Sequence, residues 1–171
     1  MKLFVTGGAG FIGSNLVRHL LATSDDEVTV FDSLTYAGNL ANLADVETDP
    51  RYRFVHGDIT DRAAVATAIS GHDAVIHLAA ESHVDRSLLD PDVFVRTNCT
   101  GTNIMCDEAT RAGVSRFVHI STDEVYGSID EGSFSETDVL APSSPYSASK
   151  AGSDLIANTS ISEKDPSSIE P

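Results

Sequence analysis

A run of closely spaced glycines near the N-terminus, "TGGAGFIG", constrains the fold of this chain more than any other stretch of its sequence. The apolar segment "KLFV" precedes it, and the helix-patterned segment "FIGSNLVRHLLA" overlaps its end. Gly8, Gly10 and Gly13 have the spacing GxGxxG, and Gly7 with the last two gives the related spacing GxxGxxG. Between a strand and a helix, bare backbone lets a pyrophosphate reach the free N–H groups of the helix N-terminus. A tight turn without a ligand is the alternative, and the context favours a dinucleotide site.

Apolar runs of strand length alternate with amphipathic segments along the rest of the chain. Further strands are predicted in "EVTVFD", "RYRFVHGD", "DAVIHLA" and "RFVHIS". Helices are predicted in "DRAAVATAIS" and from about Ser87 to Ala112, with an interruption near Pro91. Runs such as "AVIHLA" are apolar on both faces, as expected when helices cover both sides of a parallel sheet. The pattern predicts an α/β fold, a doubly wound and Rossmann-like parallel sheet of five strands.

An acidic residue ends the second predicted strand, where the dinucleotide fingerprint requires one. Asp32 lies about 20 residues beyond the glycines, so its carboxylate is expected to accept from the ribose hydroxyls of an adenosine. The same charge repels a 2′-phosphate and therefore favours NAD over NADP. A simple strand-end cap is the alternative for Asp32. Asp58 and Ile59 follow the third strand, and for Asp58 an adenine contact and a cap of the next segment are equal alternatives.

A tyrosine and a lysine near the end of the chain suggest a general base. Tyr146 and Lys150 are four residues apart on a predicted helix, so their side chains share one face. A lysine ammonium beside a tyrosine hydroxyl lowers the tyrosine pKa from about 10. The fifth strand ends in "ISTDEVYG", which brings Thr122, Asp123 and Glu124 to the edge where such sheets bind ligands. A surface helix pair and a polar loop are the alternatives, and the combination favours a catalytic site.

Several of these segments together resemble a known family. "TGGAGFIG", "FDSLTYAGNL", "GDI", "HLAAESHVDRS", "ISTDEVYG" and "YSASK" are similar to segments of the extended short-chain dehydrogenase/reductase enzymes, and specifically of the dTDP-glucose 4,6-dehydratases. The resemblance runs from Lys2 to about Ala157. The related UDP-galactose 4-epimerases share the glycine loop and the YxxxK spacing but lack the pair formed by Asp123 and Glu124.

The resemblance implies a lyase with an internal redox cycle on bound NAD. In such an enzyme Tyr146, aided by Lys150 and Thr122, takes the proton of the sugar 4-hydroxyl as hydride passes from C4 to NAD. Glu124 then removes the C5 proton while Asp123 protonates the departing C6 hydroxyl, and the hydride returns to C6. The implied substrate is dTDP-glucose or a similar nucleotide sugar, and the implied product is dTDP-4-keto-6-deoxyglucose.

The resemblance also implies a set of cofactor contacts in the loops that follow the strands. These residues are Gly7, Gly10, Phe11, Ile12, Gly13, Asp32, Leu34, Thr35, Asp58, Ile59, Leu78, Ala79, Ala80, Ser82, Tyr146 and Lys150. Ser87 is expected to point toward the cofactor or the sugar as well. His77, His83 and His119 are interpreted as structural histidines, and no spacing of Cys, His and Asp suggests a metal site.

Two other functions remain as alternatives. The first is another nucleotide-sugar 4-epimerase or dehydratase of the same family, and the presence of Asp123 and Glu124 argues against an epimerase. The second is an NAD-binding module without catalysis, which would not require Tyr146, Lys150 or the two acids.

The strong negative charge of the chain limits the kinds of partner that it can bind. Acidic residues number 26 against 11 basic residues, and the formal net charge of -15 argues against a nucleic-acid partner. Solubility or adaptation to high salt accounts for this acidity. No apolar run is long enough to span a membrane, and glycines interrupt any signal peptide, so we expect a cytoplasmic protein. Cys99 and Cys106 lie about 10 Å apart on a predicted helix, too far for a disulfide.

The last residues differ in kind from those before them. The segment "NTSISEKDPSSIEP" is polar and has no sustained period, so we expect an NAD-binding domain over residues 1–157 and a disordered or aberrant tail over 158–171. No segment is a candidate for a sixth strand or for a smaller substrate domain, which leaves "RFVHIS" as a bare sheet edge. We expect a truncated enzyme with weak NAD binding and little or no activity. The resemblance implies a homodimer built from the helix around Asn103 to Ala112 and the helix of Tyr146.

Overall fold

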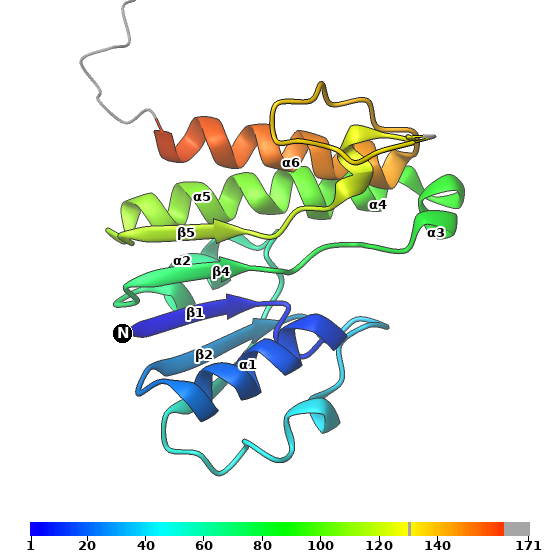
Figure 1. The fold of residues 1–171 in the computed structure, drawn as a ribbon. Coiled ribbons are helices and arrows are strands. Elements are labelled where there is room, and N and C mark those ends of the chain that lie inside the picture. The colour runs from blue at the N-terminus through cyan, green and yellow to red at the C-terminus, as the bar shows by residue number, and fades with distance from the viewer. Residues whose placement is uncertain (130, 163–171) are drawn as a thin grey trace, which may run out of the picture.

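A five-stranded parallel sheet forms the centre of the protein (Figure 1). The computed structural model describes residues 1–129 and 131–162. Every pairing in the sheet is parallel, and the strand order is β3-β2-β1-β4-β5. The predicted doubly wound fold is therefore confirmed. The strands are β1 (Lys2–Thr6), β2 (Glu27–Asp32), β3 (Tyr52–His56), β4 (Ala74–His77) and β5 (Arg116–His119).

Helices cover both faces of this sheet (Figure 1). Helix α1 packs on one face, α2 and α5 pack on the other, and α6 lies beside α5. The α-helices are α1 (Phe11–Thr23), α2 (Arg62–Ile69), α3 (Val84–Leu89), α4 (Pro91–Phe94), α5 (Thr102–Arg111) and α6 (Pro145–Ser162). Three short elements are the 3₁₀ helices η1 (Leu40–Leu43) and η3 (Asp123–Tyr126) and the π-helix η2 (Val95–Gly101).

Successive residues of β1 show why the strands are apolar on both faces. Leu3 and Val5 pack in the cluster that includes Val17 of α1, whereas Phe4 packs in the cluster that includes Val65 of α2. Alternate side chains of a strand point to opposite faces, and here each face has its own layer of helices. The interpretation of the apolar runs as buried parallel strands is confirmed.

The predicted helix from about Ser87 to Ala112 is a chain of shorter helices. The α3 helix ends before Asp90, because Pro91 starts a new helix and restricts the backbone of the residue before it. The wider turn of η2 then places Asn98 in a buried position, where its Nδ2 donates to the carbonyl oxygen of Glu81 and to Ser149 Oγ. The π-helix thereby ties the loop after β4 to α6.

The α6 helix is longer than the sequence analysis predicts. It continues to Ser162, so the prediction of an irregular segment from 158 is wrong for residues 158–162. Ala157 is buried and the hydroxyl of Thr159 donates to the carbonyl of Leu155, which anchors this last part of the helix. The remainder of the predicted tail, 163–171, lies outside the described residues.

The sheet ends at β5 among the described residues, as predicted from the absence of a sixth strand. Val118 on this strand is 41% exposed, in agreement with an edge position. Over residues 1–129 and 131–162, no helix has the length and apolar character needed to cross a membrane.

Candidate active site

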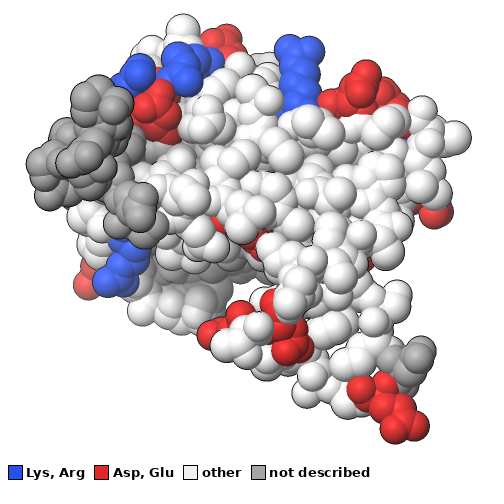
Figure 2. Space-filling model, turned by 90° about the horizontal axis from the view of Figure 1, so that it is seen from above, with Lys and Arg blue, Asp and Glu red and all other residues white. Residues whose placement is uncertain are grey.

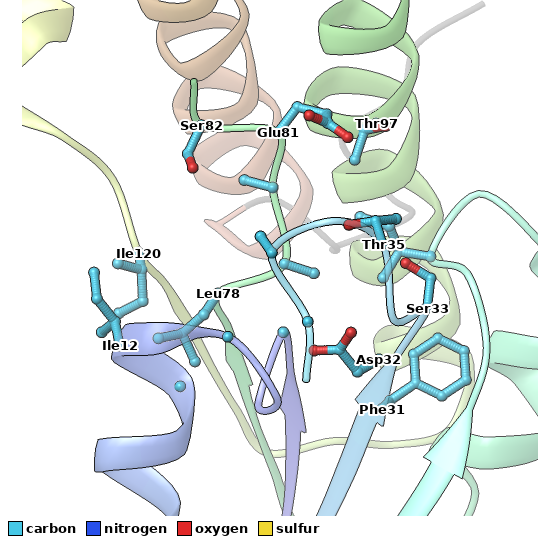
Figure 3. Close-up of a pocket in the computed structure, with 18 of the residues that line it drawn as sticks. Ile12, Phe31, Asp32, Ser33, Thr35, Leu78, Glu81, Ser82, Thr97 and Ile120 are labelled. Atoms are coloured by element: carbon cyan, nitrogen blue, oxygen red, sulfur yellow. The ribbon is translucent and has the colours of Figure 1, made fainter. Parts of the chain in front are cut away.

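A pocket of about 540 Å³ opens at the carboxyl ends of the strands (Figure 3). Loops after all five strands contribute to its wall, and its centre lies between β1 and β4, where the strand order reverses. Ligands of doubly wound sheets bind at this switch point. Among the residues predicted to contact a cofactor, those that line the pocket are Gly7, Gly10, Phe11, Ile12, Gly13, Asp32, Thr35, Asp58, Ile59, Leu78, Ala79, Ala80, Ser82, Tyr146 and Lys150.

The glycine loop forms a floor without side chains. Gly7 has a φ of +69°, a conformation that favours glycine, and a Cβ on Gly13 would lie only 2.2 Å from the carbonyl oxygen of Gly7. Helix α1 starts at Phe11, and no side chain caps its N-terminus. The first N–H groups of a helix have no partner within it, so they are available to a ligand in the adjoining pocket.

Asp32 connects the end of β2 to the two loops beside it. Its Oδ2 accepts from the N–H of Ala9 at 3.0 Å, and its Oδ1 accepts from the N–H of Leu34 at 2.8 Å. The strand-end cap considered for Asp32 is therefore present, in a residue that also lines the pocket. A carboxylate has about four acceptor positions, so these two bonds leave capacity for ribose hydroxyls. The side chain of Leu34 itself packs against the core cluster under α1 and does not line the pocket.

Asp58 lines the pocket and also accepts a hydrogen bond from the turn that follows it. Its Oδ1 accepts from the backbone N–H of Thr60 at 2.8 Å, and the residue also lines the pocket. The N-cap of α2 is a different residue, Asp61, whose carboxylate accepts from the N–H groups of Ala63 and Ala64. Asp58 therefore stabilises the turn after β3, and Asp61 caps the helix α2.

The loop after β4 crosses the pocket opposite the glycine loop. Ala79 donates its N–H to Thr6 Oγ1 at 3.1 Å, and Glu81 donates its N–H to Asn98 Oδ1 at 2.8 Å. Ser87 was expected to point toward the ligand, and the structure contradicts this. It is fully buried in α3, where its hydroxyl donates to the carbonyl of Val84 at 2.6 Å.

Side chains from two loops meet across the mouth of the pocket. The hydroxyl of Tyr36, in the loop after β2, donates to Glu81 Oε2 at 3.1 Å. The guanidinium of Arg86, at the start of α3, lies 4.0 Å from the centre of the Tyr36 ring. We call Tyr36, Glu81 and Arg86 the clasp. Figure 3 shows Glu81 and Thr35 on the two loops that the clasp joins.

Tyr146 and Lys150 enter the pocket from α6. Both side chains are buried, and Lys150 Nζ donates to the carbonyl oxygen of Ile120 at 2.5 Å. Burial raises the pKa of the Tyr146 hydroxyl above its ordinary value. A hydrogen bond with Thr122 opposes this shift, while the charges of Glu124 and Asp123 add to it.

The pKa of Tyr146 is raised in this structure, chiefly by burial, and Lys150 is not among the groups that shift it, so the lowering expected from the lysine stays a prediction. The lysine ammonium is engaged by the carbonyl of Ile120. Burial also lowers the pKa of Lys150, and the charge of Asp154 opposes that change. The tyrosine hydroxyl is instead paired with Thr122.

The three residues Thr122, Asp123 and Glu124 form a tight turn beside the tyrosine. Thr122 is the N-cap of η3, and its side chain accepts from the N–H of Glu124 at 3.3 Å. The three do not belong to the wall of the pocket, but all of them act on the hydroxyl of Tyr146. The structure thus brings the five predicted catalytic residues together at one end of the site.

Several residues of the wall were not predicted as contacts. They are Phe31, Ser33, Ala37, Gly38, Gly57, Glu81, Thr97, Ile120 and Ser121. Five of the nine are adjacent in sequence to a predicted site residue, so the strand-end loops could have been included as whole segments. Thr97 is different, because it reaches the pocket from η2 and only the packing of that helix brings it there. No group of His, Cys, Asp and Glu in the described part of the chain could hold a metal ion.

Strand order, glycine loop and pocket together define a Rossmann-type domain with its ligand site at the switch point. The chain belongs to the family described as GDP-mannose 4,6 dehydratase, which matches residues 4–165. It is similar to a dTDP-glucose 4,6-dehydratase from Streptomyces griseus, with 60% identity over 158 residues, 91% of this chain and 48% of that protein. The resemblance inferred from the sequence is therefore confirmed.

Solved structures agree with this assignment. A dTDP-glucose 4,6-dehydratase from Streptomyces venezuelae with NAD and TYD bound matches with a TM-score of 0.91 and 60% identity over 93% of this chain and 51% of that one. A UDP-Glc/GlcNAc 4-epimerase from Campylobacter jejuni matches with a TM-score of 0.87 and 31% identity over 93% of this chain and 48% of that one. The chain spans about half the length of the curated relatives it matches.

Proposed function

We propose that this chain binds NAD and carries the catalytic groups of a dTDP-glucose 4,6-dehydratase. The observation that carries the proposal is the convergence of two sets of residues at one pocket. A glycine floor and Asp32 lie at one end, and Tyr146 and Lys150 enter at the other. Such a pocket suits a dinucleotide whose reactive ring faces a general base.

The residues of this structure fit NAD in three ways. The floor at Gly10 and Gly13 has no side chain, and a Cβ on Gly13 would meet backbone at once, so the free helix N-terminus stays open to a pyrophosphate. Asp32 presents a negative charge where a 2′-phosphate would be repelled. Phe11 and Ile12, which are 83% and 65% exposed at the start of α1, supply apolar contact area at the mouth.

Proton transfers at the sugar are assigned to side chains of this chain. The chemistry that NAD supplies when bound is reversible hydride transfer, so the reaction has no net oxidation. Tyr146 accepts the proton of the 4-hydroxyl as a phenolate, the form that the hydrogen bond with Thr122 favours and that burial opposes. Glu124 removes the proton from C5, and Asp123 donates a proton to the C6 hydroxyl as it leaves as water.

Two neighbouring acids suit these opposite roles. Asp123 acts as the acid at C6 and Glu124 as the base at C5. Both belong to η3, and the hydrogen bond from the N–H of Glu124 to Thr122 holds that turn in shape. An epimerase needs no such pair, since it removes no proton from C5.

Mass spectrometry of the sugar product tests this function. The chain is incubated with NAD and dTDP-glucose, both alone and joined to the C-terminal half of the Streptomyces griseus relative. A dehydratase yields a product that has lost one water, an epimerase yields an isomer of unchanged mass, and a binding module yields no product. We expect NAD binding by the chain alone and loss of water in the joined protein. An isomer from the joined protein would replace the proposal with an epimerase.

A homodimer is the assembly we propose, with α5 and α6 at its interface. The exposed side chains of α6 are uncharged, namely those of Ala148, Leu155, Asn158 and Thr159. Figure 2 views the molecule from the side of α6, and the charged side chains visible there lie mainly toward the margins. Sedimentation should give a dimer that Leu155→Glu dissociates, and a monomeric parent chain would remove the proposal.

We further propose that the protein works in the cytoplasm. Cys99 carries a free thiol, a state that a reducing compartment preserves. Cell fractionation with an antibody against the chain tests this location, and recovery from an oxidising compartment would contradict it.

A further inference from the structure

Three residues on one face of α6 form a row that continues beyond the proposed base. Tyr146, Lys150 and Asp154 follow each other at intervals of four, so their side chains lie above one another on the helix. The proposed mechanism uses the first two. Asp154 has no role in it, although its side chain is only 18% exposed and faces the same end of β5.

The segment after β5 is bound to this row at three consecutive residues. His119 Nε2 lies 3.0 Å from Ser153 Oγ and 3.2 Å from Asp154 Oδ1. The carbonyl of Ile120 accepts from Lys150 Nζ at 2.5 Å. The hydroxyl of Ser121 donates to Asp154 Oδ2. The next residue in the chain is Thr122, so these contacts set where the turn that carries Asp123 and Glu124 begins.

The hydrogen bonds around Ser153 establish which nitrogen of His119 carries a proton. The Ser153 hydroxyl donates to the carbonyl of Lys150 at 2.8 Å, so it accepts from Nε2–H of His119. This N–H also lies beside Asp154 Oδ1, an oxygen that is buried and has no hydrogen-bond partner in the described part of the chain. His119 Nδ1 is likewise buried without a partner. Asp154 is therefore a buried negative group that the local structure satisfies on one oxygen only.

The charges around Lys150 show what this negative group does. Burial lowers the pKa of Lys150, and the charge of Asp154 acts against it. Burial raises the pKa of Asp154, but the contacts with His119 and Ser121 and the charges of His119 and Lys150 outweigh this effect and leave its pKa lowered. His77, stacked on His119 with ring centres 5.4 Å apart, is the other titratable group that faces the cluster from the sheet.

We propose that Asp154 is a positioning residue of the candidate active site. Its carboxylate lies one helical turn from the ammonium of Lys150 on the same face of α6, and through Ser121 it holds the start of the turn that carries Asp123 and Glu124. The effect of Asp154 on catalysis rests on the proposed function, which this inference deepens. The effect of the Asp154 charge on the titration of Lys150 can be measured without cofactor or sugar.

The titration of Lys150 is the decisive measurement. The chain contains only three lysines, Lys2, Lys150 and Lys164, so ¹³Cε-lysine labelling gives few NMR signals, and Lys150→Arg assigns the relevant one. We expect Asp154→Asn to lower the titration midpoint of Lys150 by about one pH unit. Asp154→Glu should retain most of the parent value. Asp92→Asn, which removes an exposed charge on α4, is the matched control and should leave the midpoint in place.

A second variant distinguishes the effect of the Asp154 charge on Lys150 from its hydrogen bond with Ser121. Ser121→Ala removes the hydroxyl that Asp154 accepts from but keeps the charge, so the Lys150 midpoint should stay while kcat of the joined protein falls. In Asp154→Asn we expect kcat to fall about tenfold with KM unchanged, because the sugar contacts remain. Circular dichroism checks that the variants fold. If Asp154→Asn does not fold, the titration of Lys150 is measured in Asp154→Ser instead.

The results distinguish failure of this inference from failure of the proposed function. An unchanged Lys150 midpoint in a folded neutral variant of Asp154 overturns the inference, even where the parent chain binds NAD. A parent chain without NAD binding or product removes the proposed function, and a lowered midpoint would still establish the charge relation.

Discussion

The two ends of the pocket are built in different ways. The nucleotide end, formed by the glycine loop, Asp32 and Asp58, is held by contacts within the first 60 residues of the chain, such as the bond from Ala9 to Asp32. The catalytic end joins the segment after β5 to α6, across about 25 intervening residues, through bonds such as that from Lys150 to Ile120. The first end joins loops that follow the paired strands β1 and β2, whereas the second joins the segment after β5 to a helix that must dock beside it.

This difference has an electrostatic consequence. The carboxylate of Asp32 is bound by two backbone N–H groups that accompany it in any folded state of the loop. The ionisation of Tyr146 and Lys150 is shifted by burial, which exists only once α6 has packed against the rest of the domain. The catalytic end should therefore be the more sensitive of the two to changes in packing and charge.

The largest effect is expected from Tyr146→Phe, which tests whether the catalytic end can fail alone. Turnover of the joined protein should fall by about a thousandfold, because the general base is lost. NAD affinity should stay within about twofold, since Asp32 and the glycine loop are untouched. Product formation and calorimetric NAD titration measure the two, with Tyr52→Phe as the control. A parallel loss of NAD affinity would show that the two ends are not separable.

Gly13→Ala tests the nucleotide end in the same manner. The new Cβ would lie 2.2 Å from the carbonyl of Gly7, so the free energy of unfolding should fall by about 3 kcal/mol in urea. Gly10→Ala is the matched control, because its nearest contact is 3.3 Å away, and it should cost less than about 1 kcal/mol. Equal destabilisation by both variants would mean that the loop relaxes freely.

Asp32→Ser is expected to weaken NAD binding by about tenfold and to lower the free energy of unfolding by about 1 to 2 kcal/mol. It removes the ribose acceptor and also the partner of two N–H groups. Asp58→Asn keeps an acceptor for Thr60 and should have a smaller effect on both quantities. Titration calorimetry and urea unfolding measure them, and unchanged NAD affinity in Asp32→Ser would remove this residue from the site.

His77 gives a pH-dependent test of the structure between the two ends. It is buried and lies 2.7 Å from Thr6 Oγ1 and 3.1 Å from Thr102 Oγ1, and burial holds its pKa well below the ordinary value. Only the unfolded chain takes up this proton near pH 6.5, so stability is full above that pH. It should fall by up to about 1.4 kcal/mol per pH unit on further acidification.

The measurement compares urea unfolding of the parent and of His77→Gln between pH 7 and about pH 5. The variant should lose part of the slope, whereas His19→Gln, at an exposed position of α1, should lose little. Identical slopes in all three proteins would contradict the neutral, buried state of His77.

The smallest effect is expected from the clasp. Tyr36→Phe removes one exposed hydrogen bond to Glu81 but keeps the ring under Arg86. We expect NAD to dissociate about threefold faster, with no change in the free energy of unfolding. Stopped-flow displacement measures this rate, and a slower release would contradict the assignment of these residues to the pocket mouth.

Much of the fold and of the nucleotide end could be predicted because short segments carry their own signals. The glycine spacing and the acid after β2 appear within about 35 residues, and they require one arrangement of strand, turn and helix. The wall residues in the loops after the strands follow from strand order. Thr97 could not be predicted, since the wider turn of η2 that brings it to the pocket has no clear sequence signature.

Errors arose where local polarity was taken as a guide to structure. The polar residues after Ala157 suggested an irregular tail, but α6 continues to Ser162 because packing and hydroxyl bonds support it. Ser87 was expected at the ligand because it follows a motif, yet the start of α3 turns it inward. In both cases the hydroxyl donates to a carbonyl in the preceding helical turn, that of Leu155 for Thr159 and that of Val84 for Ser87.

The sequence by itself determined the sheet and the glycine loop and suggested the proposed catalytic side chains, because strand period, glycine spacing and helical interval are local properties. Only the tertiary structure decided the ionisation of these side chains. The YxxxK interval brings Tyr146 and Lys150 to one face of α6, but burial of that face raises the pKa of Tyr146 and lowers the pKa of Lys150. Electrostatic energies depend on solvent exposure and on every nearby charge, Asp154 among them, and these exist only after distant segments have packed together.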